Sequence, residues 1–101
     1  MVVFKEPVGF SWDKGNQDKN WIKHKVSYQE CEEIFSDVNK RLYKDPIHSG
    51  NEKRYILLGM TKNCRLIFIV FAMRGNKVRV ISARDINKRE RSLYEEKTNI
   101  A

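Results

Sequence analysis

The sequence has little of what cross-linked or membrane-spanning proteins need. Its 101 residues include two cysteines, Cys31 and Cys64, and they form no C-x-x-C motif. This count excludes a disulfide framework and favours a reducing cytoplasm, where both thiols pack as small apolar groups; a single disulfide is the alternative. The longest apolar run, residues 66–73, is far shorter than the roughly 20 residues that cross a bilayer. Residues 1–13 lack the apolar stretch of a secretory signal, and no membrane partner is expected.

Metal-binding patterns are missing too. The two histidines, His24 and His48, and the two cysteines are not spaced like the ligands of a zinc site. We therefore predict neither a metal nor a cofactor. With 41% hydrophobic residues, the chain is of a size and composition for one globular domain, residues 1–101, with its own core.

Negative charge is scarce in the second half of the chain. Residues 51–101 carry twelve Lys or Arg against five Asp or Glu, whereas residues 1–50 carry eight of each. The whole net charge of +7 therefore lies in the second half. Such an asymmetry indicates a polyanionic partner, with nucleic acid as the first candidate. The alternative is a surface charge that keeps a small protein in solution.

Two helices are predicted in the N-terminal half. Residues 11–25 are typical of a short helix with Asp13 as its N-cap. Residues 27–30 form a capping box, in which the side chains of Ser27 and Glu30 each accept a hydrogen bond from the other's backbone N–H. Apolar residues then recur at helical spacing. The face that they form consists of Tyr28, Cys31, Ile34, Phe35 and Val38.

A sheet and a last helix are predicted after residue 40. The most apolar strand should lie centrally, and short links such as Gly75-Asn76 join antiparallel neighbours. We predict an α+β domain with two N-terminal helices, an antiparallel meander of three to four strands, and a C-terminal helix. The expected elements are an edge strand at 40–45, a loop at 45–51, strands at 53–60, 64–73 and 77–84, and a helix at 87–96.

The junction between the last strand and the last helix concentrates positive charge. Lys88, Arg89 and Arg91 lie early in the helix and two glutamates lie late, which is the reverse of what the helix dipole favours. We predict that an anion such as phosphate binds at the helix start, beside Arg84. The alternative is that carboxylates from elsewhere in the fold neutralise the cluster.

Strict alternation along residues 77–84 separates two arginines of the last strand. Arg84 falls on the same face as Val78 and Val80, whereas Arg79 falls on the opposite face with Ala83. The pattern thus predicts that Arg79 and Arg84 lie on different sides of the sheet.

Glu90 and Tyr94 are four residues apart and share one face of the last helix. A half-buried carboxyl group beside a phenol and arginines can exchange protons with a substrate. The alternative is structural: Asn87 caps the helix and Glu90 reciprocates, as in a capping box.

Four stretches, in order from Phe10 to Glu96, resemble the BrnT family of bacterial ribonuclease toxins. The first, FSWDKGNQDKNWIKHKVS at 10–27, is similar to that family's W-D … N … K-H-x-V-S opening. The others are IFSD at 34–37, HSGNEKRYILLG at 48–59, and VRVISARDINKRERSLYEE at 78–96. The matching positions in the first stretch are Trp12, Asp13, Asn20, Lys23, His24 and Ser27.

The resemblance implies a fold of the RelE type and an endoribonuclease that stops translation in the cytoplasm. It also implies the toxin's place in a type II toxin–antitoxin pair. The partner would be a BrnA-like antitoxin with a ribbon-helix-helix DNA-binding part, in a 2:2 heterotetramer that binds operator DNA through the antitoxin.

RNA carries its own nucleophile, the 2′-hydroxyl, so cleavage needs a base, an acid and cations around the phosphate, and no metal. Guanidinium groups suit the cationic role, and Arg84, Arg79 and Arg65 are the candidates. Glu90 and Tyr94 are candidates for proton transfer or for orienting an arginine.

His24 is a further acid–base candidate, because histidine titrates near neutral pH; the alternative is that it caps the end of the first helix. Other residues are candidates for binding the RNA. These are Lys53, Arg54, Lys88, Arg89, Arg91 and the loop residue His48.

A second hypothesis belongs to another class of protein. The basic face binds nucleic acid or the antitoxin without turnover, as a co-repressor, and Glu90 is then a helix cap. A further alternative is an enzyme that cleaves ribosome-bound message and leaves free RNA intact.

Overall fold

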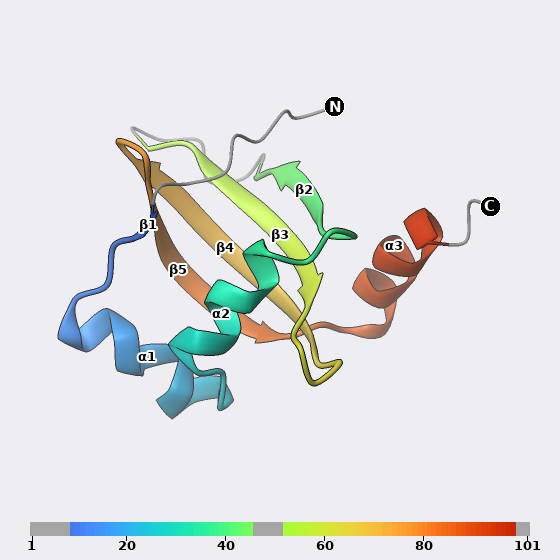
Figure 1. Cartoon of the computed structure of the whole chain (residues 1–101), viewed down its shortest axis with the longest axis horizontal. Helices are drawn as coiled ribbons and strands as arrows, with labels where there is room; N and C mark the ends of the chain where they lie inside the picture. The colour runs from blue at the N-terminus through green and yellow to red at the C-terminus, as the bar shows by residue number, and fades with distance from the viewer. Residues whose placement is uncertain (1–8, 46–51, 99–101) are drawn as a thin grey trace.

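The computed structural model describes residues 9–45 and 52–98 and consists of three helices and a five-stranded mixed sheet (Figure 1). The strand order is β1-β5-β4-β3-β2, and every neighbouring pair is antiparallel except β1 and β5. The elements are β1 (Gly9–Phe10), α1 (Lys14–His24), α2 (Tyr28–Phe35), β2 (Arg41–Lys44), β3 (Arg54–Met60), β4 (Leu66–Arg74), β5 (Lys77–Asp85) and α3 (Lys88–Thr98).

The predicted α+β class and the meander β2-β3-β4-β5 are confirmed. The prediction of a purely antiparallel sheet is wrong, because β1 joins β5 in parallel. Gly9 pairs with Lys77 and Phe10 with Val78. A strand of two residues is too short to show the alternation by which strands are predicted.

The two faces of the sheet carry separate apolar cores. Residues of alternating parity along β3 and β4 point to opposite faces. On one face, under α1 and α2, lie Val26, Cys31, Ile34, Phe35, Leu57, Ile67, Ile69, Phe71, Val78, Val80 and Ala83. On the other face a smaller cluster of Leu58, Leu66 and Tyr94 attaches α3, with Ile56, Phe68 and Ile86 partly buried around it.

α3 covers little of this second face, and Figure 1 shows it beyond the end of β5, leaning away from the sheet. In the described part of the chain, no helix is both long and apolar enough to cross a membrane.

Local helix signals in the sequence are largely confirmed. The Asp13 carboxylate accepts a 2.7 Å hydrogen bond from the backbone N–H of Asn16, and the Ser27–Glu30 capping box is complete. The prediction for Val38 is wrong, because α2 ends at Phe35 and Val38 is 85% exposed.

The cysteine prediction is half right. Cys31 is buried in the core under α2, but Cys64 is exposed in a turn, with φ of 66°. Both thiols are free, so the structure has no disulfide between them.

A β-bulge in β5 changes which residues share a face. Phe71 pairs with Val80 and Val70 pairs with Ser82, so Ile81 is an extra residue on β5. After the bulge the alternation is inverted, and Ala83 joins Val80 in the core under α1 and α2.

The bulge overturns the prediction that Arg79 and Arg84 lie on different sides. Arg84 pairs with Phe68 and Arg79 pairs with Ala72. Phe68 and Ala72 are four residues apart on β4 and therefore point to the same face. Both arginines consequently lie on the face that α3 only partly covers.

Side chains of α1 close the edge of β5 beyond the two residues of β1. Asn16 Nδ2 donates to the Val80 carbonyl at 2.9 Å and Lys19 Nζ donates to the Ile81 carbonyl at 2.9 Å. Asn20, which is buried, accepts from the Ala83 N–H at 3.0 Å. These bonds replace the strand partner that an open edge lacks and tie α1 to the bulged segment.

Gly59 permits the close approach of α2 to β3, so a larger residue there should destabilise the fold. A Cβ at Gly59 would lie 2.5 Å from Ile34 Cγ2 and 3.2 Å from the Ile34 carbonyl oxygen. We expect Gly59→Ala to lower the free energy of unfolding by about 1–3 kcal/mol, as overpacking does, measured by urea denaturation.

The matched control is Gly15→Ala in α1, where the new Cβ would find its nearest neighbour at 3.8 Å. Alanine should there leave stability unchanged or raise it by up to about 1 kcal/mol, because it favours a helix over glycine. Equal effects of the two substitutions would contradict the packing explanation.

Candidate functional site

Arg84 is held on two sides at the junction of β5 and α3. Its Nη1 and Nη2 atoms each donate to one carboxylate oxygen of Glu90 at 2.9 Å, and Nη1 also donates to the Asp85 carbonyl at 3.1 Å. The guanidinium carbon lies 4.0 Å from the centre of the Phe68 ring. A bidentate carboxylate and an aromatic face together fix both the edge and the plane of the group.

Glu90 also completes a capping box with Asn87. The backbone N–H of Asn87 donates to Glu90 Oε1 at 2.9 Å, and the N–H of Glu90 donates to Asn87 Oδ1 at 2.8 Å. Burial raises the pKa of the Glu90 carboxyl, but hydrogen bonds from Arg84 and from the Asn87 N–H outweigh it and hold the pKa below its ordinary value. The carboxylate is therefore ionised at neutral pH and suited to orienting Arg84.

The position of the Glu90 carboxylate is relevant to the prediction that an anion binds at the start of α3. Glu90 occupies the start of α3 and neutralises Arg84. Arg84 is thus neutralised by a carboxylate of α3 itself and not by one from elsewhere in the fold, and the anion site at the helix start stays a prediction.

Arg79 is held by one contact. Its Nη2 donates to Asp13 Oδ2 at 3.1 Å, and its side chain is 23% exposed. A hydrogen bond from the Asn16 N–H, and then one from Arg79, hold the pKa of the Asp13 carboxyl below its ordinary value. The remaining N–H groups of Arg79 make no hydrogen bond with any described residue, so most of its donor capacity is available to a ligand.

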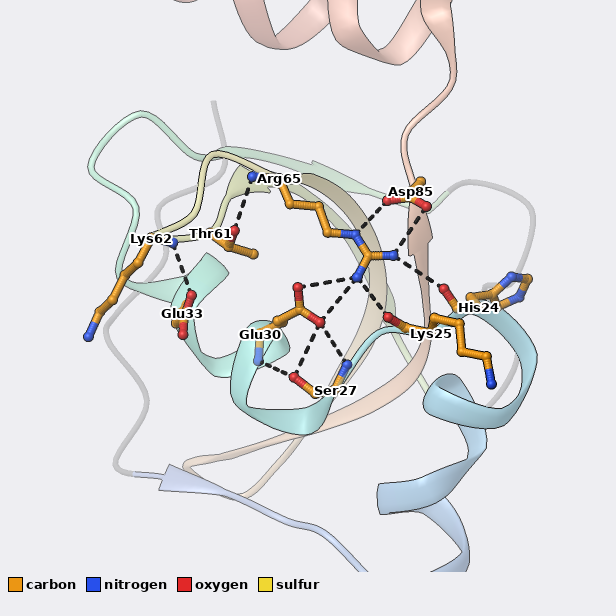
Figure 2. A network of polar contacts seen from close by, with 9 residues as sticks. All are labelled: His24, Lys25, Ser27, Glu30, Glu33, Thr61, Lys62, Arg65 and Asp85. Carbon is orange, nitrogen blue, oxygen red and sulfur yellow. Dashed lines mark hydrogen bonds and ion pairs between the residues drawn. The ribbon is translucent and has the colours of Figure 1, made fainter.

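Arg65 lies at the junction of α1 and α2 and is surrounded by acceptors (Figure 2). Nε and Nη2 donate to the two carboxylate oxygens of Asp85 at 2.7 and 3.1 Å. Nη1 donates to Glu30 at 3.1 Å and to the Lys25 carbonyl at 2.7 Å, and Nη2 donates to the His24 carbonyl at 3.2 Å. Every N–H of this guanidinium is directed at the protein, since arginine has five of them.

The three predicted arginines therefore differ in what they can still bind. Arg65 has no spare donor, Arg84 keeps its Nε–H and one N–H on Nη2, and Arg79 keeps all but one. The structure brings Arg79 and Arg84 to one face of the sheet and leaves Arg65 apart from them, at the end of α1.

A protein-family model described as the ribonuclease toxin BrnT of type II toxin–antitoxin systems matches residues 12–90. The chain is a member of the BrnT family. The resemblance seen in the sequence is thereby confirmed. The match to the BrnT family ends at Glu90 and so includes both members of the Arg84–Glu90 pair.

A solved structure supports the fold. The 1.1 Å crystal structure of the Brucella abortus ribonuclease toxin BrnT is similar to this chain with a TM-score of 0.57 and 20% sequence identity. The similarity covers 79% of this chain and 97% of that chain. At this identity it shows that the BrnT fold is shared. No curated protein matches the chain.

Tyr94 lies beyond the matched BrnT region and contacts another part of the fold. Its hydroxyl donates to Asp37 Oδ2 at 2.7 Å, and the Met60 N–H donates to the same oxygen at 2.8 Å. Burial, and then the hydrogen bond to Asp37, raise the pKa of the Tyr94 hydroxyl above its ordinary value. Tyr94 thus fastens α3 to the segment that follows α2, and the structure does not bring its hydroxyl to Arg84.

Of the other predicted residues, strand pairing places Arg54 on the face of Arg79 and Arg84. Arg54 pairs with Ala72, which in turn pairs with Arg79, so the two arginines flank Ala72 on that face. His24 is exposed at the end of α1, and His48 lies outside the described residues. Lys53, Lys88 and Arg89 are exposed, and Arg91 pairs with Glu95 at 3.1 Å.

Two contributors to the site and one to its scaffold were missed in the sequence. Phe68 belongs to a nearly continuous apolar strand, which gives no sign that one ring supports an arginine. Asp13 was predicted as a helix cap and is also the partner of Arg79. Asp37 lies in the IFSD stretch, but its bond to Tyr94 spans 57 residues. Within the described ranges, no group of three or more His, Cys, Asp or Glu side chains is arranged to hold a metal ion.

Arg65 should be a stabilising residue of this BrnT-family chain. We expect Arg65→Met to lower the free energy of unfolding by about 2 kcal/mol or more, because two carboxylates and two carbonyls lose their donor. Urea denaturation at neutral pH measures the loss. Arg91→Ala is the control: its exposed pair with Glu95 should contribute less than about 0.5 kcal/mol.

The effect of Arg65→Met should depend on pH. Hydrogen bonds from Arg65 hold the pKa of the Asp85 carboxyl below its ordinary value of 3.8. A lowered folded-state pKa stabilises the protein above the ordinary value, and this contribution is lost as the pH falls through the folded-state pKa. The difference between parent and variant should therefore narrow below about pH 4; a constant difference down to pH 2 would contradict the assignment.

Proposed function

We propose that this BrnT-family chain is a metal-independent endoribonuclease whose RNA-binding site is the sheet face that carries Arg79 and Arg84. One observation carries the proposal: the β5 bulge brings to one face Arg79 and Arg84, the two of the three predicted catalytic arginines that retain unused N–H groups. The family description, a ribonuclease toxin, supports the reaction class.

The chemistry proposed is attack by the RNA on itself. The 2′-oxygen forms a bond to the adjacent phosphorus and the 5′-oxygen leaves, which gives a 2′,3′-cyclic phosphate and a 5′-hydroxyl. A base accepts the 2′-hydroxyl proton and an acid supplies a proton to the departing 5′-oxygen. Because the nucleophile belongs to the substrate, what the protein must supply is positive charge around the phosphate and proton transfer.

Each predicted residue then receives a role. Arg79 and Arg84 bind phosphate oxygens, and Glu90 orients Arg84 without exchanging its proton. Arg65 and Tyr94 hold the scaffold. His24 lies at the end of α1 beside Arg65, apart from Arg79 and Arg84, so its part in proton transfer rests on the sequence alone. The basic residues that attract the RNA backbone are Lys53, Arg54, Lys88, Arg89, Arg91 and His48.

The biological setting is also part of the proposal. As a type II toxin, the chain has an antitoxin partner. We infer that a BrnA-like antitoxin covers the basic face in a 2:2 heterotetramer and binds operator DNA. We further infer a RelE-like arrangement, and inhibition of translation in the cytoplasm as the outcome of RNA cleavage.

The second candidate, a binding module without turnover, also has an observation in its favour. Glu90 completes the capping box of α3 with Asn87, and the pKa of its carboxyl is lowered. The non-catalytic hypothesis requires this structural role. The two candidates differ in whether RNA is cut.

Cleavage of labelled RNA in EDTA tests the proposal. We expect the parent to cleave, and we expect Arg79→Ala and Arg84→Ala each to lower kcat/KM by about 10²–10³, as loss of one donor to a developing oxyanion does. Lys62→Ala is the charge-matched control, because Lys62 is exposed in the turn before β4. Its activity should match that of the parent.

A folded parent that binds RNA in a salt-dependent way but leaves it intact would overturn free-RNA cleavage. Cleavage that EDTA abolishes and Mg²⁺ restores would overturn metal independence alone.

Glu90→Gln separates the two candidates. If the chain is an enzyme, the neutral amide orients Arg84 less well, and kcat should fall about tenfold or more while RNA affinity is kept. If the chain only binds, removing one negative charge should tighten RNA binding slightly and change nothing else. Single-turnover cleavage and equilibrium binding, measured on the same preparation, distinguish these outcomes.

A further inference from the structure

The guanidinium group of Arg84 has contacts with protein on only part of its surface. The guanidinium carbon lies 4.0 Å from the centre of the Phe68 ring, and Glu90 accepts hydrogen bonds along the edge that carries Nη1 and Nη2. The side chain is nevertheless 37% exposed. Among the described residues, no acceptor bonds its Nε–H, and no second ring lies against the side opposite Phe68.

The contacts of Arg84 favour stacking over simple charge attraction. Three of its N–H groups already donate to Glu90 and Asp85, and the Glu90 carboxylate compensates its charge. Phe68 lies on one side of the guanidinium and Glu90 lies along one of its edges. The opposite side can then accept a second planar group. Guanidinium planes stack on nucleobases much as aromatic rings do.

The surface beside Arg84 continues this platform. Val70 lies two residues from Phe68 on β4, pairs with Ile56 on β3, and both are partly exposed. Phe68, Val70 and Ile56 share the Arg84 face, because paired residues and residues two apart point the same way. An apolar floor beside a stacked arginine suits the base and sugar of a nucleotide.

We propose that the outer face of Arg84, supported by Phe68, binds an unpaired nucleobase, so that the RNA bound at this site is single-stranded. The inference rests on the proposed RNA-binding function and specifies its substrate class. Bases within a duplex are covered on both faces by their neighbours and cannot reach the platform. The two spare N–H groups of Arg84 lie in its plane, so a phosphate contact and a stacked base do not compete.

Equilibrium binding with cleavage blocked tests this inference. The probe is a 2′-O-methyl oligoribonucleotide, which lacks the attacking hydroxyl, as a single strand and as a duplex with its complement. Arg84→Lys keeps the charge but removes the plane. We expect it to weaken single-strand binding about tenfold, the scale of one lost base stack, with duplex binding changed less than about twofold.

The salt dependence provides a second readout. Since Arg84→Lys preserves the positive charge, the slope of log K against log salt should equal that of the parent. The matched control is Arg74→Lys, because Arg74 also pairs with a carboxylate, that of Glu52 at 3.2 Å, and no aromatic ring in the described part of the chain lies under it. Its single-strand affinity should not change.

Phe68→Leu keeps an apolar side chain but removes the supporting ring, and it should reproduce the selective loss with an unchanged far-UV CD spectrum. Equal losses for single strand and duplex, or unchanged affinity in Arg84→Lys, would overturn the inference. Cleavage of unmodified RNA by the parent is scored separately. Its absence would overturn the proposed function, whereas the binding comparison decides the stacking site.

Discussion

The β5 bulge determines where the positive charge of this fold is presented. Without the extra residue Ile81, strict alternation would turn Arg84 toward the core under α1 and α2, on the side of Val78 and Val80. A guanidinium there would displace apolar contacts. With the bulge, Ala83 fills the core position, and Arg84 joins Arg79 on the other face. Bulges often change the direction of side chains beside functional sites. Here one extra residue, Ile81, reverses the face to which each later side chain of β5 points.

The two faces of the sheet carry cores of different size. The face under α1 and α2 holds the larger core, and the Arg65 network fastens the ends of α1, α2 and β5 together beside it. The opposite face has a smaller cluster that holds α3 through Tyr94. Ile56 packs against that cluster, whereas Val70 and Arg79 are not part of it. A ligand that binds along this face therefore need not displace the larger core under α1 and α2.

Sequence reasoning succeeded where partners are close in the chain. The Ser27–Glu30 and Asn87–Glu90 boxes, the Asp13 cap and the strand pattern around β4 are all local, so residue type and spacing suffice. It failed where the decisive partner is distant. Arg65 finds Glu30 and Asp85 at separations of 35 and 20 residues, and Arg79 finds Asp13 at 66. The bulge was missed for another reason, since nothing in Val80-Ile81-Ser82 departs from a regular strand.

The case of Glu90 shows that a structural and a functional interpretation of one residue need not compete. As a cap, its carboxylate is fixed at the start of α3 by the Asn87 N–H. Once fixed, it is a rigid bidentate acceptor for Arg84, which a mobile side chain on a helix surface would not be. The hydrogen bonds that lower its pKa keep the carboxylate ionised at neutral pH, and the bonds from Arg84 hold that guanidinium beside Phe68. Helix capping is therefore the means by which this carboxylate orients the guanidinium.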